Sequence, residues 1–383
     1  MEVGDILAKL VSFPTLGGQS NLEIANWILG FLEQRGVEVH RAFNEQGDKL
    51  ALHCRFGPAV DGGLILSGHM DVVPVEGQDW TRDPFELVEK DNLYFGRGTC
   101  DMKGFLACCL SMTDSLQSAN LKKPIYFAFS FDEEIGCQGA PMLIEHIKST
   151  YRERPSFAVI GEPTCMVPTI GQKGICIYET TVNGSAGHSS RIKTEVSAVH
   201  EASRLIIWLE DKMNDLIQKG QMDDRFNPAH TSIHVGMIQG GIAPNIVADT
   251  CTFTWDVRTI PSDSLDGIKL DFDEYCKGRV KLLRNRFDAF NIRTTEFHPA
   301  VPALDTSANS EITTLVKTLV EFPTVNAVSY AAEAGQFSEA GFQSIICGPG
   351  DIAQAHRADE FVEIPQLEKC RAFIKKLKDN FSE

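Results

Sequence analysis

Short apolar runs alternate with longer helical patterns from the start of the chain to about Lys173, and again near its end. The short runs are rich in β-branched or aromatic residues, and each ends at a polar cluster. Strands that alternate with helices favour an α/β domain whose mainly parallel sheet is buried on both faces. The expected strands are Leu64–Ser67, Ile125–Phe131, Phe157–Ile160 and Ser344–Cys347, and the expected helices are Met102–Leu116, Glu311–Val320 and Pro365–Asn380.

The segment between these two stretches has a different order of elements. It is β-α-β-β-α-β, the order of a ferredoxin-like module. We therefore expect a domain of residues 1–174 and 298–383, interrupted by an inserted domain of residues 175–297. The expected strands of the inserted domain are Ile175–Val182, Thr231–Ile238, Thr250–Arg258 and Asn291–Phe297, and its helices are Val196–Ile217 and Ser264–Cys276.

The net charge indicates which partners are unfavourable, and the cysteines indicate the cellular compartment. Net charge is −16 over 383 residues and the pI is about 5.1, so nucleic acid and anionic membranes are poor partner candidates. No apolar run approaches the roughly 20 residues of a membrane helix, and the first residues lack the basic region of a secretory signal. The eleven cysteines form no C-x-x-C pair, so we expect free thiols and a cytoplasmic location.

Polar side chains follow the ends of four successive expected strands. Open α/β sheets bind ligands at the carboxyl ends of their strands, so these side chains are expected to gather at one sheet edge. A further carboxylate stands just before the expected helix at Met102. In chain order the residues are His69, Asp71, Asp101, Asp132, Glu133, Glu134, Glu162 and His356.

Two histidines and several carboxylates form the mixed ligand set that Zn²⁺ or Co²⁺ accepts. Singly, each residue has an ordinary explanation: Asp101 as a helix N-cap, or Glu133 and Glu134 as a solvated loop. These explanations would have to hold independently at four strand ends, so a metal site is favoured. Two ions roughly 3.5–4 Å apart would need a bridging carboxylate and would activate one water. Asp71 would face the same way as His69 and hold the far nitrogen of its imidazole.

The motifs around these residues resemble those of the M20 family of metallopeptidases and deacylases, and within it the branch of acetylornithine deacetylases. The resemblance runs almost from end to end, and the motifs are specific together where any one alone would be weak. They are Ser67-Gly68-His69-Met70-Asp71-Val72-Val73-Pro74, Gly96-Arg97-Gly98-Thr99-Cys100-Asp101-Met102-Lys103-Gly104, Asp132-Glu133-Glu134, Gly161-Glu162-Pro163-Thr164, Ala186-Gly187-His188-Ser189-Ser190 and Ala355-His356-Arg357-Ala358-Asp359-Glu360.

The resemblance implies a binuclear centre, with two Zn²⁺ per subunit or Co²⁺ in their place. Asp101 would bridge the two ions. His69 and Glu162 would complete one site, and Glu134 and His356 would complete the other.

The resemblance also implies amide hydrolysis with Glu133 as general base. Glu133 would take a proton from the activated water and pass it to the leaving nitrogen, with a pKa tuned towards neutrality. A cis peptide between Asp101 and Met102 is implied as well, which survives only where a site enforces it.

In such enzymes the inserted domain is a lid and dimerisation surface, so the resemblance implies a homodimer. His188 would reach the partner subunit's active site and stabilise the oxyanion, although by itself it is an ordinary loop residue. Asn245, after Gly240-Gly241, and Arg258, at a strand end, are candidates for holding the substrate carboxylate. Arg258 could equally form a surface salt bridge.

The element Ala331-Ala332-Glu333-Ala334-Gly335-Gln336-Phe337 resembles one in acetylornithine deacetylases and differs from that of succinyl-diaminopimelate desuccinylases. Glu333 could meet the cationic ornithine side chain, or could serve only in packing. The expected reaction is metal-dependent removal of the acetyl group from N2-acetyl-L-ornithine, in arginine biosynthesis. Succinyl-diaminopimelate, acetylcitrulline, other N-acyl amino acids and dipeptides remain alternative small-molecule substrates. A non-catalytic binding protein is disfavoured because the complete ligand set and Glu133 are present.

Overall fold

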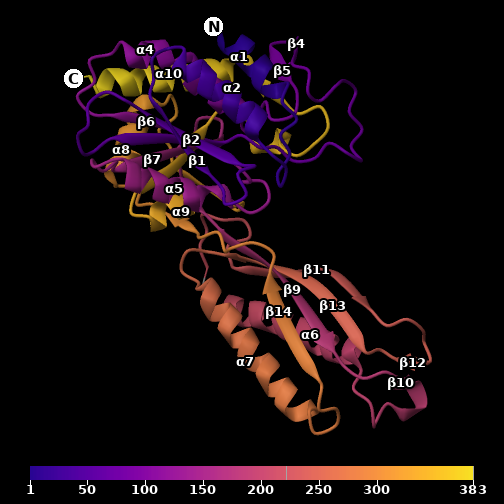
Figure 1. The fold of residues 1–383 in the computed structure, drawn as a ribbon. Helices are drawn as coiled ribbons and strands as arrows, with labels where there is room; N and C mark the ends of the chain where they lie inside the picture. The colour runs from indigo at the N-terminus through magenta and orange to yellow at the C-terminus, as the bar shows by residue number, and fades with distance from the viewer. Residues whose placement is uncertain (221, 383) are drawn as a thin grey trace. The chain divides into compact units, whose positions relative to one another are not determined.

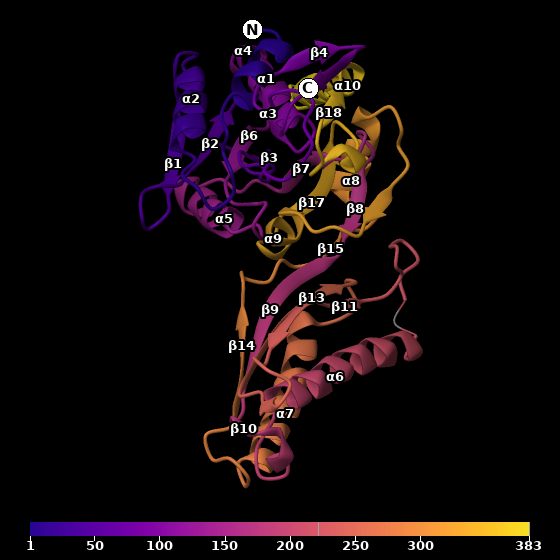
Figure 2. The same cartoon turned by 90° about the vertical axis from the view of Figure 1, so that its right-hand side faces the viewer.

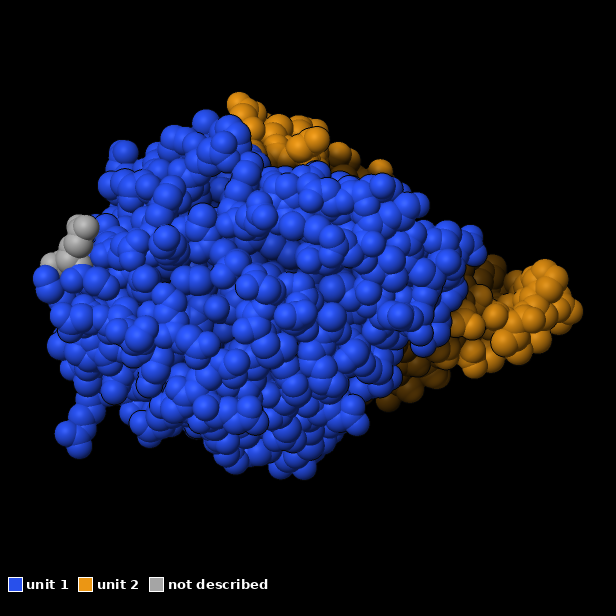
Figure 3. Space-filling model, turned by 90° about the horizontal axis from the view of Figure 1, so that it is seen from above, with its two compact units in different colours: residues 1–171, 304–327, 332–383 blue, residues 172–303, 328–331 orange. Residues whose placement is uncertain are grey.

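The computed structural model describes residues 1–220 and 222–382, and the chain divides into two compact units (Figure 3). Unit 1 comprises residues 1–171, 304–327 and 332–383, and unit 2 comprises residues 172–303 and 328–331. The inserted unit begins three residues before the expected boundary (172 against 175) and ends six residues after it (303 against 297). The short return at 328–331 has no signal in the hydrophobic pattern.

Unit 1 is built on one large sheet with a small three-stranded sheet beside it (Figure 1). The strands of the large sheet are β1 (Val39–Phe43), β2 (Leu50–Phe56), β3 (Leu64–His69), β6 (Ile125–Ser130), β7 (Phe157–Pro163), β8 (Thr169–Gln172), β15 (Leu304–Asp305), β16 (Asn326–Val328) and β17 (Gln343–Gly348); those of the small sheet are β4 (Val88–Lys90), β5 (Leu93–Phe95) and β18 (Phe361–Glu363). The order in the large sheet is β1-β2-β6-β3-β7-β17-β8-β15, with β16 paired to β8.

The centre of the large sheet is parallel, which confirms the expected α/β class. Strand β3 pairs in parallel with β6 and β7, and β7 pairs in parallel with β17, whereas β1 and β2 form an antiparallel edge. Every residue of β3, β6 and β7 is buried. This is the pattern of strands covered on both faces, and it explains why these segments are nearly continuous apolar runs.

Helices cover both faces of the large sheet (Figure 1). They are α1 (Val3–Val11), α2 (Leu22–Glu33), α3 (Lys103–Ser111), α4 (Thr113–Gln117), α5 (Gly139–Thr150), α8 (Glu311–Leu319), α9 (Ala334–Glu339) and α10 (Ile364–Asn380). Helices α1, α2 and α10 lie on one side, and α5 and α9 lie on the other. The helix expected over Met102–Leu116 is two helices, because the amide of Met112 bonds to the carbonyl of Cys109 in a tighter turn that separates α3 from α4.

Unit 2 has the ferredoxin-like order of elements (Figure 2). They are β9 (Gly174–Asn183), β10 (Gly187–His188), α6 (Ala198–Gln218), β11 (Ser232–Gly240), β12 (Ile246–Val247), β13 (Thr250–Thr259), α7 (Leu265–Leu283) and β14 (Asn291–Glu296). The four-stranded antiparallel sheet has the order β11-β13-β9-β14, and the pair β10-β12 stands apart from it. Burial alternates along β9 and β13, so one face of the sheet packs against the helices.

Helix α7 continues seven residues beyond the expected end at Cys276. Its last two turns are largely polar, and only Leu283 there is buried. The helical pattern of apolar residues therefore ends before the helix ends. Among the described residues, no helix has both the length and the apolar character needed to cross a membrane.

Candidate metal centre

The fold brings the expected ligands to one edge of the large sheet. His69 is the last residue of β3, and Glu162 is the penultimate residue of β7. Glu133 and Glu134 follow the end of β6. His356 follows β17, the next strand along the sheet. Because β3, β6, β7 and β17 are parallel, their carboxyl ends meet, and the side chains that follow them converge.

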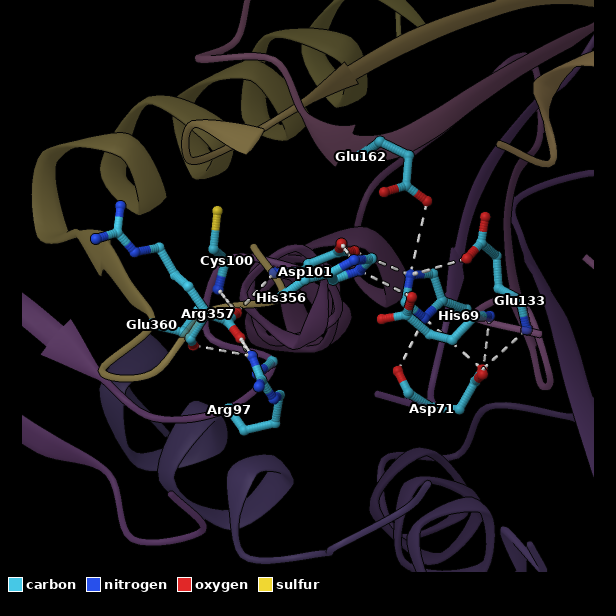
Figure 4. Close-up of polar contacts among 12 residues, drawn as sticks. His69, Asp71, Arg97, Cys100, Asp101, Glu133, Glu162, His356, Arg357 and Glu360 are labelled. Carbon is cyan, nitrogen blue, oxygen red and sulfur yellow. Dashed lines mark hydrogen bonds and ion pairs between the residues drawn. The ribbon is translucent and has the colours of Figure 1, made fainter. Parts of the chain in front are cut away.

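Asp101 lies between the two histidines (Figure 4). Its Oδ1 is 3.1 Å from Nε2 of His69, and its Oδ2 is 3.3 Å from Nε2 of His356. It is not a helix cap, because Met102 is the N-cap of α3 and no side chain caps that helix. The peptide between Asp101 and Met102 is cis, as the resemblance implied. The two oxygens of one carboxylate therefore face the two halves of the cluster.

Glu162 and Glu134 complete opposite halves. Oε1 of Glu162 is 3.7 Å from Nε2 of His69, and Oε2 of Glu134 is 3.0 Å from Nε2 of His356. Oε1 of both glutamates is buried without a hydrogen-bond partner among the described residues. A buried carboxylate oxygen without a donor is costly, and a cation removes that cost. Two groups of these residues hold their donor atoms close enough for one ion, His69 with Glu133 and Glu162, and His69 with Asp101 and Glu134. The donors are the mixed nitrogen and oxygen type that Zn²⁺ or Co²⁺ accepts, so a metal fits.

The close carboxylates and histidines of the cluster shift one another's pKa values. Burial and then the Asp101 carboxylate raise the pKa of Glu162 well above its usual value and that of Glu134 to about 7. Hydrogen bonds to Asp101 and Glu134 raise the pKa of His356 to about 10. Burial would raise the pKa of Asp101, but hydrogen bonds from His356 and His69 lower it below its usual value. Protons thus balance these anions, and metal binding would release them.

Glu133 stands beside the donor set. Its Oε2 is 4.0 Å from Nε2 of His69, and its Oε1 accepts a hydrogen bond from Sγ of Cys137 at 3.2 Å. Burial raises the pKa of Glu133 well above its usual value, since it outweighs the opposing effect of His69. A carboxyl group whose pKa is raised from its usual value towards the working pH is better suited to proton transfer in both directions.

Asp71 does not make the contact expected from its spacing. Nδ1 of His69 is 2.9 Å from the backbone carbonyl of Asp71, whereas the nearest carboxylate oxygen of Asp71 is 3.7 Å away. That carboxylate instead accepts the backbone N–H groups of Glu133 at 3.2 Å and Glu134 at 3.1 Å. The spacing placed Asp71 beside His69 correctly, but the side chain turns to the loop after β6. It therefore positions the two glutamates.

Glu333 is buried at the N-terminus of α9, with 1% of its surface exposed. Burial raises its pKa to about 7, and the hydroxyls of Ser130 and Ser67 act in the opposite direction. Its charge also contributes to the raised pKa of Glu133, so the two carboxyls are neighbours.

The three candidates in unit 2 divide between its two ends. Exposed His188 pairs with Ile246 across β10 and β12, and the amide of Ser189 donates to the carbonyl of Asn245 at 3.0 Å. Arg258 is opposite Ile175 on β9, near the other end of β13, with Nε 3.5 Å from an oxygen of Asp256. The eight residue steps from 250 to 258 span on the order of 25 Å. Within one copy, Asn245 and Arg258 therefore lie at different ends of unit 2.

Three residues with contacts at the centre were assigned no role from the sequence. Cys137 touches Glu133, and the Arg97–Glu360 ion pair lies directly beside Asp101. Each lies in or next to a quoted motif, but the partners of Glu360 are about 260 positions away in sequence. Spacing within a motif carries no information on such contacts.

The model of peptidase family M20/M25/M40 matches residues 65–380. The chain belongs to this family. It is similar to an acetylornithine deacetylase of Myxococcus xanthus, at 32% identity over 377 residues that cover 96% of this chain and 94% of that one. It is similar to another from Aliivibrio salmonicida, at 32% identity over 359 residues that cover 94% and 91%.

Solved structures of the family share the fold. A metallo-carboxypeptidase of Sulfolobus solfataricus has a TM-score of 0.77 at 17% identity and covers 100% of this chain and 99% of that one. A dinuclear metal-binding peptidase of Bacillus subtilis has a TM-score of 0.66 at 15% identity and covers 98% and 96%. This M20 chain is a metal-dependent amide hydrolase, and the family and enzyme class expected from its motifs are confirmed.

Proposed function

We propose that this M20 enzyme removes the acetyl group from N2-acetyl-L-ornithine, a step of arginine biosynthesis. The observation that carries the proposal is the carboxylate of Asp101 between His69 and His356, with Glu133 beside it. The choice of substrate rests on the relatives named acetylornithine deacetylase, which match nearly the whole chain.

We assign the ligands of two metal ions, Zn²⁺ or Co²⁺, to the two halves of the cluster. His69, Asp101 and Glu162 would hold one ion, and Asp101, Glu134 and His356 the other. When bound, such ions polarise the amide carbonyl and lower the pKa of the attacking water. The unpaired oxygens of Glu134 and Glu162 support this assignment.

Glu133 would move the proton. Its carboxylate takes a proton from the water as the oxygen attacks the carbonyl carbon, and gives it to the nitrogen as the C–N bond breaks. The products are acetate and the free α-amine. Asp71 orients Glu133 through the backbone of the loop after β6.

We propose that unit 2 acts as lid and dimerisation surface, with His188 in the partner subunit's active site. Nδ1 of His188 accepts the backbone N–H of Ser190 at 3.2 Å, so in the neutral ring the proton lies on Nε2, which can donate to an oxyanion. Because Asn245 lies beside His188, it would enter with it. Arg258 remains a candidate for the substrate carboxylate. The edge strand β11 carries exposed Met237 (69%) and leads to Ile242 (86%), apolar surface that a homodimer would cover.

The acyl and amino-acid specificity is the finer part of the proposal. Glu333 is the candidate that would favour a cationic side chain. Succinyl-diaminopimelate, acetylcitrulline and dipeptides are the competing substrates within the same chemistry. The eleven cysteines are all free, which supports a cytoplasmic enzyme.

A hydrolysis panel on chelator-stripped protein, with and without added Zn²⁺ or Co²⁺, tests the proposal. It contains N2-acetylornithine, N-acetylcitrulline, N-succinyl-diaminopimelate and a dipeptide. We expect metal-dependent release of acetate, with the highest kcat/KM for acetylornithine. Preference for another substrate would replace the proposed one, and metal-independent cleavage or none would refute the mechanism.

A further inference from the structure

The loop that carries His356 is tied to the segment that carries Asp101 by one buried carboxylate (Figure 4). Glu360 has no exposed surface. Its Oε1 accepts the backbone N–H groups of Cys100 at 2.9 Å and Asp101 at 3.1 Å. Its Oε2 accepts Nη1 of Arg97 at 2.8 Å and the backbone N–H of Gly98 at 3.0 Å. The Glu360 side chain thus binds the backbone N–H groups of Asp101 and of two residues just before it.

Arg97 and Gln78 close this connection into a ring. Arg97, 1% exposed, also donates to the carbonyl of Arg357 at 3.3 Å and to Oε1 of Gln78 at 2.5 Å. Nε2 of Gln78 in turn donates to the carbonyl of His356 at 3.0 Å. This ring of hydrogen bonds therefore holds the backbone of the Asp101 segment and the backbone of the His356 loop.

The two halves of the metal centre depend on this ring to different degrees. His69 is fixed by its place at the end of a buried strand, and it is 1% exposed. The side chain of His356 is 54% exposed, and its backbone lies in the left-handed region at φ +62°. Such a position is held by its surroundings and not by its own conformational preference.

We propose that Glu360, with Arg97 and Gln78, is a positioning device that sets the metal affinity of the half-site formed by Asp101, Glu134 and His356. Glu360 and Arg97 are fully buried, so they act through the backbone that they hold. They hold two ligands from distant parts of the chain at the separation that one ion requires, as outer contacts of metal ligands do. The inference rests on the proposed metal centre but not on the identity of the substrate.

The test is a titration of the chelator-stripped Glu360→Gln variant with Zn²⁺. Calorimetry measures the affinity of each ion, and metal analysis after dialysis measures how many ions stay bound. A glutamine replaces one of the two oxygens by an N–H₂ group, and each oxygen accepts from two N–H donors, so at least two of the four hydrogen bonds must be lost. We expect the ion held by Asp101, Glu134 and His356 to bind 10- to 100-fold more weakly. The other ion shares only Asp101 with it, so its affinity should fall several-fold less. With acetylornithine, KM should stay constant, and kcat should recover at saturating metal. Glu363→Gln, an exposed neighbour, should bind both ions as the wild type does.

Wild-type affinity for both ions in Glu360→Gln would overturn the proposal, as would equal weakening of both. Should that variant lack the near-UV circular dichroism of the folded protein, Gln78→Ala takes its place, since Gln78 is partly exposed. We expect it to weaken the same ion about fivefold, and unchanged affinity would then refute the device. A wild-type protein that binds two ions but cleaves no panel substrate would refute the proposed function and leave this inference standing.

Discussion

Unit 1 contains two buried polar clusters of opposite character. One is the acidic cluster at the carboxyl ends of the parallel strands, described above. The other lies at the antiparallel edge, where His40 of β1, His53 of β2 and His146 of α5 meet Tyr151. Nε2 of His53 is 2.7 Å from Nδ1 of His146, its Nδ1 is 3.0 Å from the hydroxyl of Tyr151, and His40 stacks on its ring.

Histidines respond to these two surroundings in opposite ways. Burial, with His146 and His40, lowers the pKa of His53 to about 3, so His53 is neutral, and each of its ring nitrogens has a partner. In the acidic cluster the pKa of His356 rises to about 10, and oxygens of Glu134 and Glu162 stay unpaired. Buried histidine alone therefore does not mark a metal site. The acidic cluster differs because several carboxylates surround its two histidines.

The largest effect is expected from Glu133→Gln, which leaves the donor set intact and removes proton transfer. The kcat for acetylornithine should fall about 10³-fold or more, and bound metal should stay at the wild-type level. Stopped assays of acetate release and metal analysis measure the two quantities. Glu145→Gln, on the exposed surface of α5, is the control. A fall in metal content equal to the fall in kcat would make Glu133 a ligand and not a base.

Metal removal should destabilise the protein only if the acidic cluster is intact. Metal at a hundredfold excess over Kd stabilises the folded state by about 3 kcal/mol per site, because it binds that state alone. Asp101→Ala should abolish most of this difference, which urea unfolding with and without chelator measures. His53→Gln should retain it. Metal-dependent stability in Asp101→Ala would contradict the bridging role.

The histidine cluster should make stability sensitive to acid. The unfolded chain takes up a proton as pH falls through about 6.5, but folded His53 does not until about pH 3, so stability is full above pH 6.5 and declines below it. Between pH 7.5 and 5 the loss should be about 2 kcal/mol. His53→Gln should flatten the urea-unfolding profile over this range, and exposed His200→Gln should leave its slope unchanged. An unaltered slope in His53→Gln would exclude His53 as the cause.

The smallest effect is expected from Glu333→Gln. Because burial raises the pKa of Glu333 to about 7, the side chain carries only part of a negative charge at neutral pH. Its attraction for a cationic substrate is correspondingly small, and KM for acetylornithine should rise only about threefold. KM for acetylcitrulline, whose side chain is neutral, should not change. Parallel rises for both substrates, or none, would remove Glu333 from substrate selection.

The sequence was most informative where local pattern decides the structure. The buried runs of β3, β6 and β7 are strands because only continuous apolar segments can be covered on both faces, and the residues at their ends converge as a consequence. The end of α7 was missed because its final turns are polar. The partners of Asp71 and Glu360 were missed because those contacts depend on side-chain direction and on chain segments far apart.

The position of β17 has a consequence for synthesis on the ribosome. This strand pairs in parallel with β7, but 180 residues separate Pro163 at the end of β7 from Gln343 at its start (343 − 163). At about 5–20 residues per second, this interval takes roughly 10 to 35 s. During that time His69, Asp101, Glu134 and Glu162 exist without His356. A nascent or truncated chain can therefore assemble at most half of the metal centre, and activity requires a chain translated past residue 356.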